Sequence, residues 1–233
     1  MWSGPRNLST LLMRSFSNRE DTVVFDEPFY SYYLHETKLD HPMKKEILSY
    51  YSVKEDEVVN SILEKKDGIY YYKFMTHHIL DKTNIQWLKY GINCFLIRHP
   101  SKVINSYIKK NKLTNMTDIG FDQMLRLFNY VKTNISNKVI VVNSDLLLED
   151  PENYIKKLCQ ILKIDFTPNM MNWSKGITKD FGIWHEHWYH DIINSTGFTK
   201  TKNIIKEVPQ EYENIYMKSL EIYENMNTYS IKL

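Results

Sequence analysis

The residues from Gly4 to Thr10 carry backbone and side-chain groups that could bind a small anion. The segment reads Gly4, Pro5, Arg6, Asn7, Leu8, Ser9 and Thr10. Apolar residues recur at a helical spacing from Leu8 to Phe16, so we expect a helix that begins inside the segment and directs its free backbone N–H groups at the loop. Such a helix end attracts phosphate or sulfate. The Arg6 guanidinium and the two neighbouring hydroxyls could converge on the same tetrahedral anion.

This loop differs from the usual loop that binds ATP or GTP. That loop follows the pattern G-x-x-x-x-G-K-[ST], in which the lysine reaches the phosphates and the Ser or Thr holds magnesium. The segment 4–10 has neither the lysine nor the second glycine. It therefore predicts an anion site of another kind, and an ordinary capped turn is the alternative explanation of the segment taken by itself.

A second candidate site lies at the end of the apolar run from 93 to 97. Arg98 follows this run, and Ser106 comes eight residues later in a stretch that Pro100 predicts to be helical. Ligands of open α/β sheets bind at the carboxyl ends of the strands, so we expect Arg98 to face the same rim as the segment 4–10. Ser106 could reach the same anion from the side. An ion pair for Arg98 and a surface position for Ser106 are the alternatives.

The elements that must position these residues follow from alternating patterns along the chain. Short apolar runs predict strands at 1–3, 22–25, 69–74, 93–97 and 139–142. Helical patterns predict a helix that starts at a capping box, Ser52-x-x-Glu55, and further helices over 100–108, 121–131, 151–162 and 209–226. This alternation is typical of an α/β fold with a central parallel sheet flanked by helices.

Size and charge limit the classes of function. The 233 residues are enough for one domain, 1–233, with a substantial core. Because 30 basic residues oppose 28 acidic ones, we expect neither nucleic acid nor an anionic membrane as a partner. Only two cysteines occur, no run approaches the about 18 apolar residues of a membrane span, and no leader is recognised, so we expect a cytoplasmic protein. The oligomeric state stays open.

Several motifs, in order along the chain, resemble those of the sulfotransferase superfamily and its small bacterial-type members. Pro5-Arg6-Asn7 with Ser9-Thr10 is similar to the family's 5′-phosphosulfate loop, and Arg98 with Ser106 resembles its 3′-phosphate site. Further matches are Ser3 to Asn7, Asp26-Glu27-Pro28, the strand and helix from Val139 through Asp145 and Asp150-Pro151, His187-Trp188-Tyr189, and Ser195 to Phe198. Leu8 departs from the pattern, because it stands where the family has a glycine that permits a positive φ or a close backbone approach.

The resemblance implies a P-loop-type three-layer fold and the transfer of a sulfuryl group. The implied donor is the co-substrate 3′-phosphoadenosine 5′-phosphosulfate, and no metal is implied. The implied acceptor is a hydroxyl or an amine of a small molecule, which the sequence does not identify. Residues 4–10 would bind the donor together with Arg98 and Ser106.

Sulfuryl transfer, by analogy with phosphoryl transfer, needs in-line positioning, cations around the moving group and a base. Arg6 and Lys73 are the candidate cations. For the base, the resemblance ranks Glu27 narrowly ahead of His77 or His78. Histidine, with an ordinary pKa of about 6.5, suits a base at neutral pH, whereas a carboxylate near about 4.3 needs burial to raise its pKa. An ion pair for Glu27, a helix cap for the histidines and a strand-end position for Lys73 are the alternatives.

The segment from about 170 to 233 is expected to form a lid or a lobe on the acceptor side. Within it, Gly182 would let the backbone approach the ligand closely, and Trp184 could stack on the nucleotide. Packing of Trp184 inside the lobe is equally compatible with the sequence. The histidines between 185 and 190 lack the pattern H-E-x-x-H, so we expect no metal site there.

Two other functions remain open. A non-catalytic protein that binds a nucleotide or sulfonucleotide would explain the unusual Leu8. A P-loop kinase or hydrolase would bind ATP with magnesium, which the missing loop lysine argues against.

Overall fold

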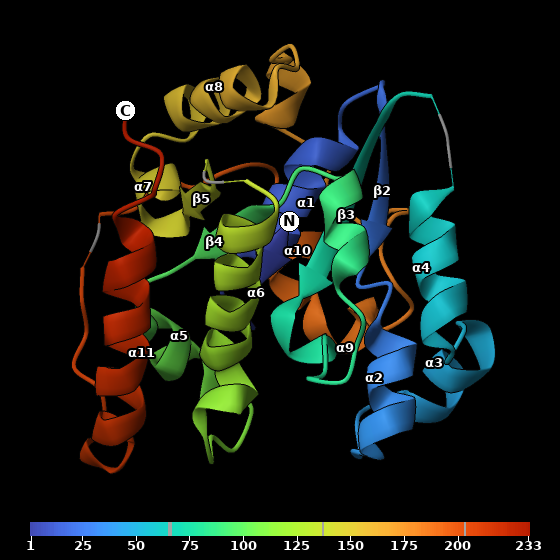
Figure 1. Cartoon of the computed structure of the whole chain (residues 1–233). Helices are drawn as coiled ribbons and strands as arrows, with labels where there is room; N and C mark the ends of the chain where they lie inside the picture. The colour runs from blue at the N-terminus through green and yellow to red at the C-terminus, as the bar shows by residue number, and fades with distance from the viewer. Residues whose placement is uncertain (65–66, 137, 203) are drawn as a thin grey trace.

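A computed structural model describes residues 1–64, 67–136, 138–202 and 204–233. One parallel sheet runs through the molecule in the strand order β2-β3-β1-β4-β5 (Figure 1). The strands are β1 Trp2–Ser3, β2 Thr22–Asp26, β3 Ile69–Met75, β4 Cys94–Ile97 and β5 Ile140–Asn143. Each bound lies within one residue of the prediction. The short apolar runs therefore form the predicted α/β sheet.

Helices flank the sheet on both faces. They are α1 Ser9–Ser17, α2 Tyr30–Thr37, α3 Lys44–Tyr50, α4 Glu55–Leu63, α5 Pro100–Tyr107, α6 Phe121–Asn134, α7 Ser144–Glu149, α8 Pro151–Leu162, α9 His185–Trp188, α10 His190–Ile193 and α11 Glu213–Asn227. Short 3₁₀ turns are η1 Thr76–His78, η2 Gln86–Tyr90, η3 Met116–Ile119, η4 Pro168–Met170 and η5 Gln210–Tyr212. No helix of the described ranges is both long and apolar enough to cross a bilayer.

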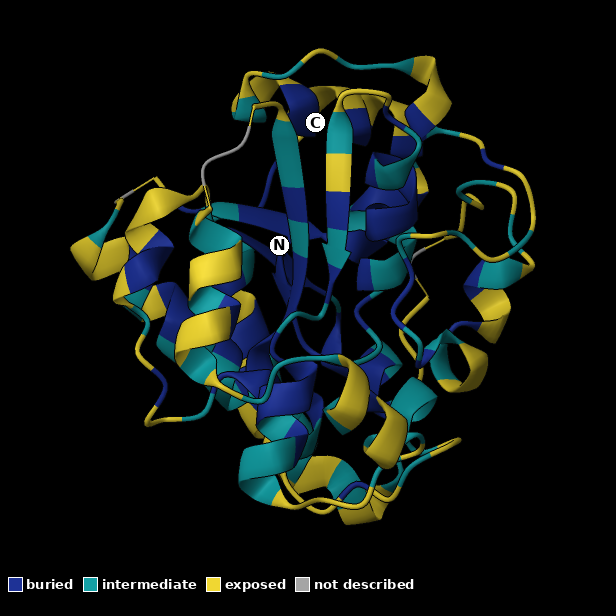
Figure 2. Ribbon diagram, turned by 90° about the vertical axis from the view of Figure 1, so that its right-hand side faces the viewer, coloured by how far each residue is buried: buried dark blue, intermediate teal, exposed yellow. Residues whose placement is uncertain are grey.

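Two hydrophobic clusters make the molecule three layers deep. One cluster joins the sheet to α1 and α8 through residues such as Leu12, Phe16 and Leu158. The other joins it to α5, α6 and α11 through residues such as Ile104 and Phe128. In Figure 1, α6 and α11 lie in front of the sheet and α1 lies behind it. Buried residues follow the sheet and the inner helix faces, whereas exposed residues lie on the outer faces (Figure 2).

The parallel register brings the carboxyl ends of all five strands to one edge of the sheet. Ser3 of β1 pairs with Met75 of β3 and with Leu96 of β4. Asp26 of β2 pairs with Lys73 of β3. The segments that follow these strands, including the loop before α1, therefore meet at this edge, which we call the carboxyl rim.

A large cavity lies at the opposite edge. Its volume is about 700 Å³, and most of its walls are apolar or aromatic side chains at the amino ends of β3 and β4, including Met1, Tyr70, Tyr72 and Trp87. It contains none of the sequence-predicted site residues, so we do not assign the function to it.

Two expectations about the helices need correction. The capping box at Ser52 does not form, because α4 begins at Glu55 and the Ser52 hydroxyl binds the Lys54 N–H and the Glu57 carboxylate instead. The segment 170–233, of which residue 203 lies outside the described ranges, is not one lid. Its helix α11 packs on the sheet through Ile222 and Met226 and binds Asn143 at the end of β5, whereas the part around α9 and α10 lies at the end of β2.

Candidate active site

The loop between β1 and α1 has a tightly constrained backbone. A Cβ atom on Gly4 would lie 2.3 Å from the carbonyl oxygen of Ile119, so no larger residue fits there. Leu8 has φ 68° and precedes α1, and its carbonyl accepts hydrogen bonds from the first turn of the helix. Arg6 also has a positive φ, 65°. The backbone thus adopts at Leu8 the left-handed conformation that the family's glycine would allow, although a leucine there costs about 1–2 kcal/mol.

The structure brings the loop and the second candidate site together. The Arg6 Nε donates a hydrogen bond to the Ser106 Oγ at 2.8 Å. The Arg98 guanidinium donates to the Arg6 carbonyl at 3.0 Å. These contacts join residues about a hundred positions apart in the sequence, so a ligand at the loop has both guanidinium groups within reach. α1 begins directly after this loop, and the N–H groups at the start of a helix have no partner inside it.

The Arg98 guanidinium has unused capacity for an anion. Its Nε atom is buried and has no hydrogen-bond partner, although the Asp145 carboxylate lies 3.8 Å away. Asp145 is held mainly by Lys102, at 2.8 Å, and by the His99 backbone N–H. Burial lowers the pKa of Arg98, against the opposing effect of Asp145. The side chain is 19% exposed, and a guanidinium is a preferred partner of phosphate, so this position fits a phosphate group.

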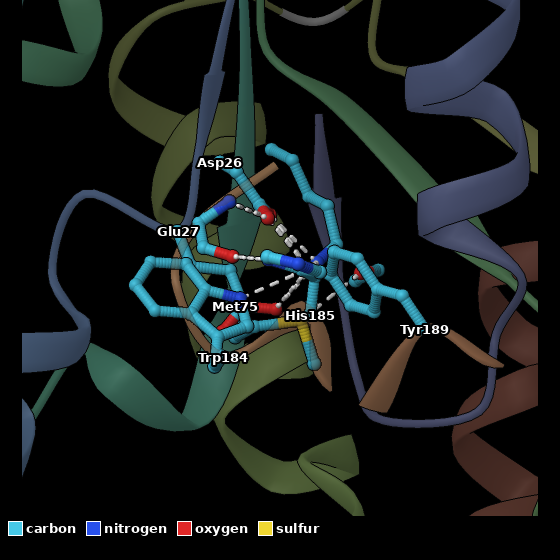
Figure 3. Close-up of polar contacts among 9 residues, drawn as sticks. Asp26, Glu27, Met75, Trp184, His185 and Tyr189 are labelled. Atoms are coloured by element: carbon cyan, nitrogen blue, oxygen red, sulfur yellow. Dashed lines mark hydrogen bonds and ion pairs between the residues drawn. The ribbon is translucent and has the colours of Figure 1, made fainter. Parts of the chain in front are cut away.

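A second polar cluster lies on the neighbouring strands β2 and β3. The Lys73 ammonium, in a residue that is 1% exposed, donates to the Asp26 carboxylate at 2.9 Å, to the Glu27 carboxylate, and to the Tyr189 hydroxyl at 2.6 Å. Figure 3 shows Asp26, Glu27, Tyr189 and Trp184 directed toward one point. We call Asp26, Glu27, Lys73 and Tyr189 the buried ionic cluster. All three Lys73 protons are engaged there, so the lysine is not a free cation beside the loop.

Glu27 has the least usual environment of the cluster. Its φ is 45°, a left-handed value that strains a residue with a side chain. The Glu27 side chain is 11% exposed, so it keeps some contact with the solvent, whereas the Asp26 side chain is 1% exposed. Burial raises the pKa of Glu27, and the Lys73 ammonium opposes part of this rise. Such a carboxyl group is closer to the proton affinity that a base needs at neutral pH.

The histidine pair lies in an aromatic environment. The His78 ring stacks between Tyr30 and Tyr33, with centroid distances of 4.7 and 4.8 Å. The Nδ1 atoms of His77 and His78 are buried without a hydrogen-bond partner. Burial lowers the pKa of His77 to about 3 and that of His78 well below its usual range. Both rings are therefore neutral at pH 7 and hold a proton weakly.

The segment before α10 differs from the expectation. Trp184 is 1% exposed and donates from its indole nitrogen to the Tyr189 hydroxyl at 3.1 Å, so its ring presents no stacking surface for a nucleotide. A Cβ on Gly182 would lie 2.1 Å from the Trp184 ring. The glycine thus makes room for the indole instead of a ligand, and its N–H binds Asp26 at 3.1 Å.

Sequence reasoning gave no role to Asp26 or Tyr189. Both belong to motifs quoted above, Asp26-Glu27-Pro28 and His187-Trp188-Tyr189. Membership in these motifs is the sequence signal that could have pointed to them. Their roles depend on the β2–β3 register and on the fold of the chain after residue 170. Within the described ranges, no group of three or more His, Cys, Asp and Glu residues is arranged to hold a metal ion.

Comparisons with known proteins identify the family. The fold is that of an α/β protein with a parallel sheet, and the candidate anion-binding residues lie at the carboxyl ends of its strands. Residues 1–230 match the family described as "Sulfotransferase domain", and the chain belongs to this family. The resemblance and the fold class predicted from the sequence are both confirmed.

Two solved structures share the fold. The sulfotransferase domain from the curacin biosynthetic pathway aligns with a TM-score of 0.52 and 15% identity, over 93% of this chain and 95% of that one. The sulfotransferase domain from the Synechococcus PCC 7002 olefin synthase aligns with a TM-score of 0.56 and 13% identity, over 100% of this chain and 94% of that one. At these identities the likeness concerns the fold alone.

Two curated relatives come from Arabidopsis thaliana. Branched-chain-amino-acid aminotransferase-like protein 1 is 29% identical over 98% of this chain, and protein 2 is 29% identical over 95% of it. The chain spans only 41% and 40% of their respective lengths. The names of these relatives therefore refer to proteins that are much longer than the stretch that this chain matches.

The buried histidines predict a loss of stability in acid. In the unfolded chain His77 has an ordinary pKa of about 6.5, whereas the folded value is about 3. Between these values the unfolded state binds more protons, so each such histidine lowers the free energy of unfolding by about 1.4 kcal/mol per pH unit as the pH falls. In urea titrations at pH 7 and 5.5, His78→Phe should show a smaller loss than the wild type. The exposed control His190→Gln should match the wild type, and an equal loss in all three proteins would contradict the prediction.

The backbone at residue 8 predicts an order of stability. Leu8→Val places a β-branched side chain in a left-handed conformation and should lower the free energy of unfolding by more than about 1 kcal/mol. Leu8→Gly removes the conformational cost while it adds freedom to the unfolded chain, so it should leave stability within about 1 kcal/mol of the wild type. Urea unfolding of the three proteins measures the order, and a valine variant as stable as the wild type would contradict it.

Proposed function

We propose that this protein transfers a sulfuryl group from 3′-phosphoadenosine 5′-phosphosulfate to a hydroxyl or amine of a small molecule. The observation that carries the proposal is the contact between the two anion-binding elements, in which Arg98 binds the carbonyl of Arg6 and Arg6 binds Ser106. A ligand with acidic groups at two separated positions, one held at the N-terminus of α1 and one held by Arg98, would use both elements. This donor has that chemistry.

In this donor site, the loop before α1 and the segment after β4 would bind different acidic groups of the donor. The 5′-phosphosulfate would lie against the N–H groups of residues 4–10, with the hydroxyls of Ser9 and Thr10 and the Arg6 guanidinium beside it. The 3′-phosphate would bind the partly exposed guanidinium of Arg98 and the hydroxyl of Ser106. Gly182 and Trp184 are not assigned to the donor, because they pack on the buried ionic cluster.

The reaction needs the acceptor to lose a proton as it attacks sulfur. A new S–O or S–N bond forms, the bond between sulfur and the bisphosphate breaks, and the acceptor proton passes to a base. We assign the base to Glu27, whose pKa is raised by burial, instead of His77 or His78, whose pKa values are lowered by burial. Arg6 stabilises charge on the moving group, while Lys73 acts through the carboxylates that it binds.

The two rival functions differ in what they bind. A kinase or hydrolase would require ATP with magnesium, and a binding module would hold the donor without turnover. We also propose a cytoplasmic location, because Cys94 and Cys159 are both buried free thiols, which suits a reducing compartment.

The proposed base is tested by Glu27→Gln. The amide oxygen can still accept from Lys73 but cannot take a proton, so donor affinity should stay unchanged while sulfuryl transfer slows by about 10² to 10⁴. The assay follows release of adenosine 3′,5′-bisphosphate over a panel of small hydroxyl and amine acceptors. Glu36→Gln, which alters an ion pair with Lys82 away from the cluster, is the matched control and should retain full activity. Full activity of Glu27→Gln would assign the base to the histidine pair.

The donor site is tested by calorimetry with adenosine 3′,5′-bisphosphate. The wild type should bind it more tightly than ATP with magnesium. Arg98→Ala should weaken this binding about 10- to 100-fold, the loss expected from charged hydrogen bonds to a phosphate. The control Arg126→Ala removes a guanidinium that binds the carbonyl of Ile79 and should not change the affinity. Unchanged binding in Arg98→Ala would reject the 3′-phosphate site, and a preference for ATP with magnesium would favour the kinase.

A further inference from the structure

The Tyr189 hydroxyl occupies the centre of the buried ionic cluster. Tyr189 lies between α9 and α10 and is 4% exposed. Its oxygen lies 2.7 and 2.9 Å from the two carboxylate oxygens of Asp26 and 3.3 Å from Glu27. It also receives hydrogen bonds from Lys73, at 2.6 Å, and from the Trp184 indole, at 3.1 Å. One hydroxyl therefore joins the C-terminal segment to the carboxylates at the end of β2 and to Lys73 on β3.

The direction of these hydrogen bonds follows from counting protons. A phenol has one proton and two lone pairs. Lys73 and Trp184 can only donate, so they occupy the lone pairs and the Tyr189 proton must be donated to a carboxylate. Asp26 is the nearer acceptor. Asp26 then receives three donors, namely Lys73, Tyr189 and the Gly182 N–H. Among the described residues, Glu27 receives one close donor, Lys73.

The charges of the cluster do not balance when both carboxyl groups are ionised. Two carboxylates share one ammonium in a site from which water is nearly excluded, so one carboxyl group gains a proton more easily than the other. The group with fewer donors is the one that takes the proton. The difference between Asp26 and Glu27 in received hydrogen bonds thus decides which carboxyl group can exchange protons, and Tyr189 supplies a large part of that difference.

We propose that Tyr189 is a positioning residue that donates its proton to Asp26 and thereby leaves Glu27 as the carboxyl group that accepts the proton of the acceptor. This inference rests on the proposed sulfuryl transfer. Tyr189 does not touch the reacting atoms and acts through the carboxylates. This role of Tyr189 explains why Glu27, and not the adjacent Asp26, would act as the base. The Glu27 side chain also keeps more contact with the solvent.

The other titratable groups around the cluster do not compete for this proton. They come from α2, the segment after α3, β3 and η1, and they are Tyr30, Tyr51, Tyr71, His77 and His78. The tyrosines have pKa values raised by burial and stay neutral as phenols. The histidines have pKa values lowered by burial and stay neutral as imidazoles.

The test compares Tyr189→Phe with the wild type by two readouts. The first is the titration of ¹³C-labelled glutamate carboxyl carbons by NMR, with the Glu27 signal assigned through Glu27→Gln. The second is the pH dependence of kcat/KM. Loss of the phenol donor should raise the apparent pKa of the carboxyl pair by about one unit or more, because a donor to the ionised form is removed. The acid limb of the rate profile should move by the same amount.

Two further proteins separate positioning from packing. Tyr154→Phe removes another fully buried hydroxyl, which accepts from the Asn143 N–H at 2.9 Å, and should lower stability without moving the carboxyl titration. Replacement of Tyr189 by 3-fluorotyrosine keeps the hydroxyl and makes it a stronger donor, so the apparent pKa of the pair should fall. This variant also answers the question if Tyr189→Phe does not fold.

The outcomes distinguish this inference from the proposed function. An unchanged carboxyl titration in both Tyr189 variants would overturn the positioning role, whatever the activity. A shifted titration in a protein that turns over no acceptor would support the role of Tyr189 in the cluster and reject the sulfuryl transfer on which its purpose depends.

Discussion

The arrangement of the carboxyl rim depends on the compensation of two buried carboxylates by one ammonium. Lys73 lies on β3, its carboxylate partners end β2, and the hydroxyl that completes its hydrogen bonds comes from the chain between α9 and α10. Loss of one member of such a buried network leaves an uncompensated charge and typically costs about 3–5 kcal/mol. The cluster therefore fixes where the C-terminal segment lies on the sheet, in addition to any role in proton transfer.

The loop between β1 and α1 depends on a different constraint, the close approach of two backbones. Gly4 packs against the Ile119 carbonyl, and Gly120, with φ 72°, packs against Gly4 and the Thr76 hydroxyl. The Thr76 hydroxyl donates to the Gly120 carbonyl at 2.9 Å. The start of α6 thus forms the back wall of the loop. The Arg98 guanidinium supports the loop from another side, because it donates to the Arg6 carbonyl. This hydrogen bond and the wall together explain how Arg6 and Leu8 are held at positive φ values that their side chains disfavour.

The sequence predicted the strands well because their signals are local. Each apolar run is bounded by polar or turn residues, and the parallel topology then implies that Arg98 and the loop share one rim. The fate of Lys73 was not predictable in this way, because its partner Asp26 is defined by the register of β2 on β3. Burial of Trp184 and of the histidine pair depends likewise on segments far away in the sequence. The short helices α2, α3 and α7 were not predicted either, since seven or so residues are too few to show a helical period.

The contact between Gly4 and the Ile119 carbonyl also bears on how quickly a ligand can associate. A phosphate-binding loop that is mobile before binding loses conformational freedom when the ligand orders it, and this loss subtracts from the affinity. Here the wall behind the loop has set its shape in advance. A dianion that approaches the loop would find it already in its binding conformation. The rate of association should therefore be governed by diffusion and charge attraction and not by a slow rearrangement of the polypeptide.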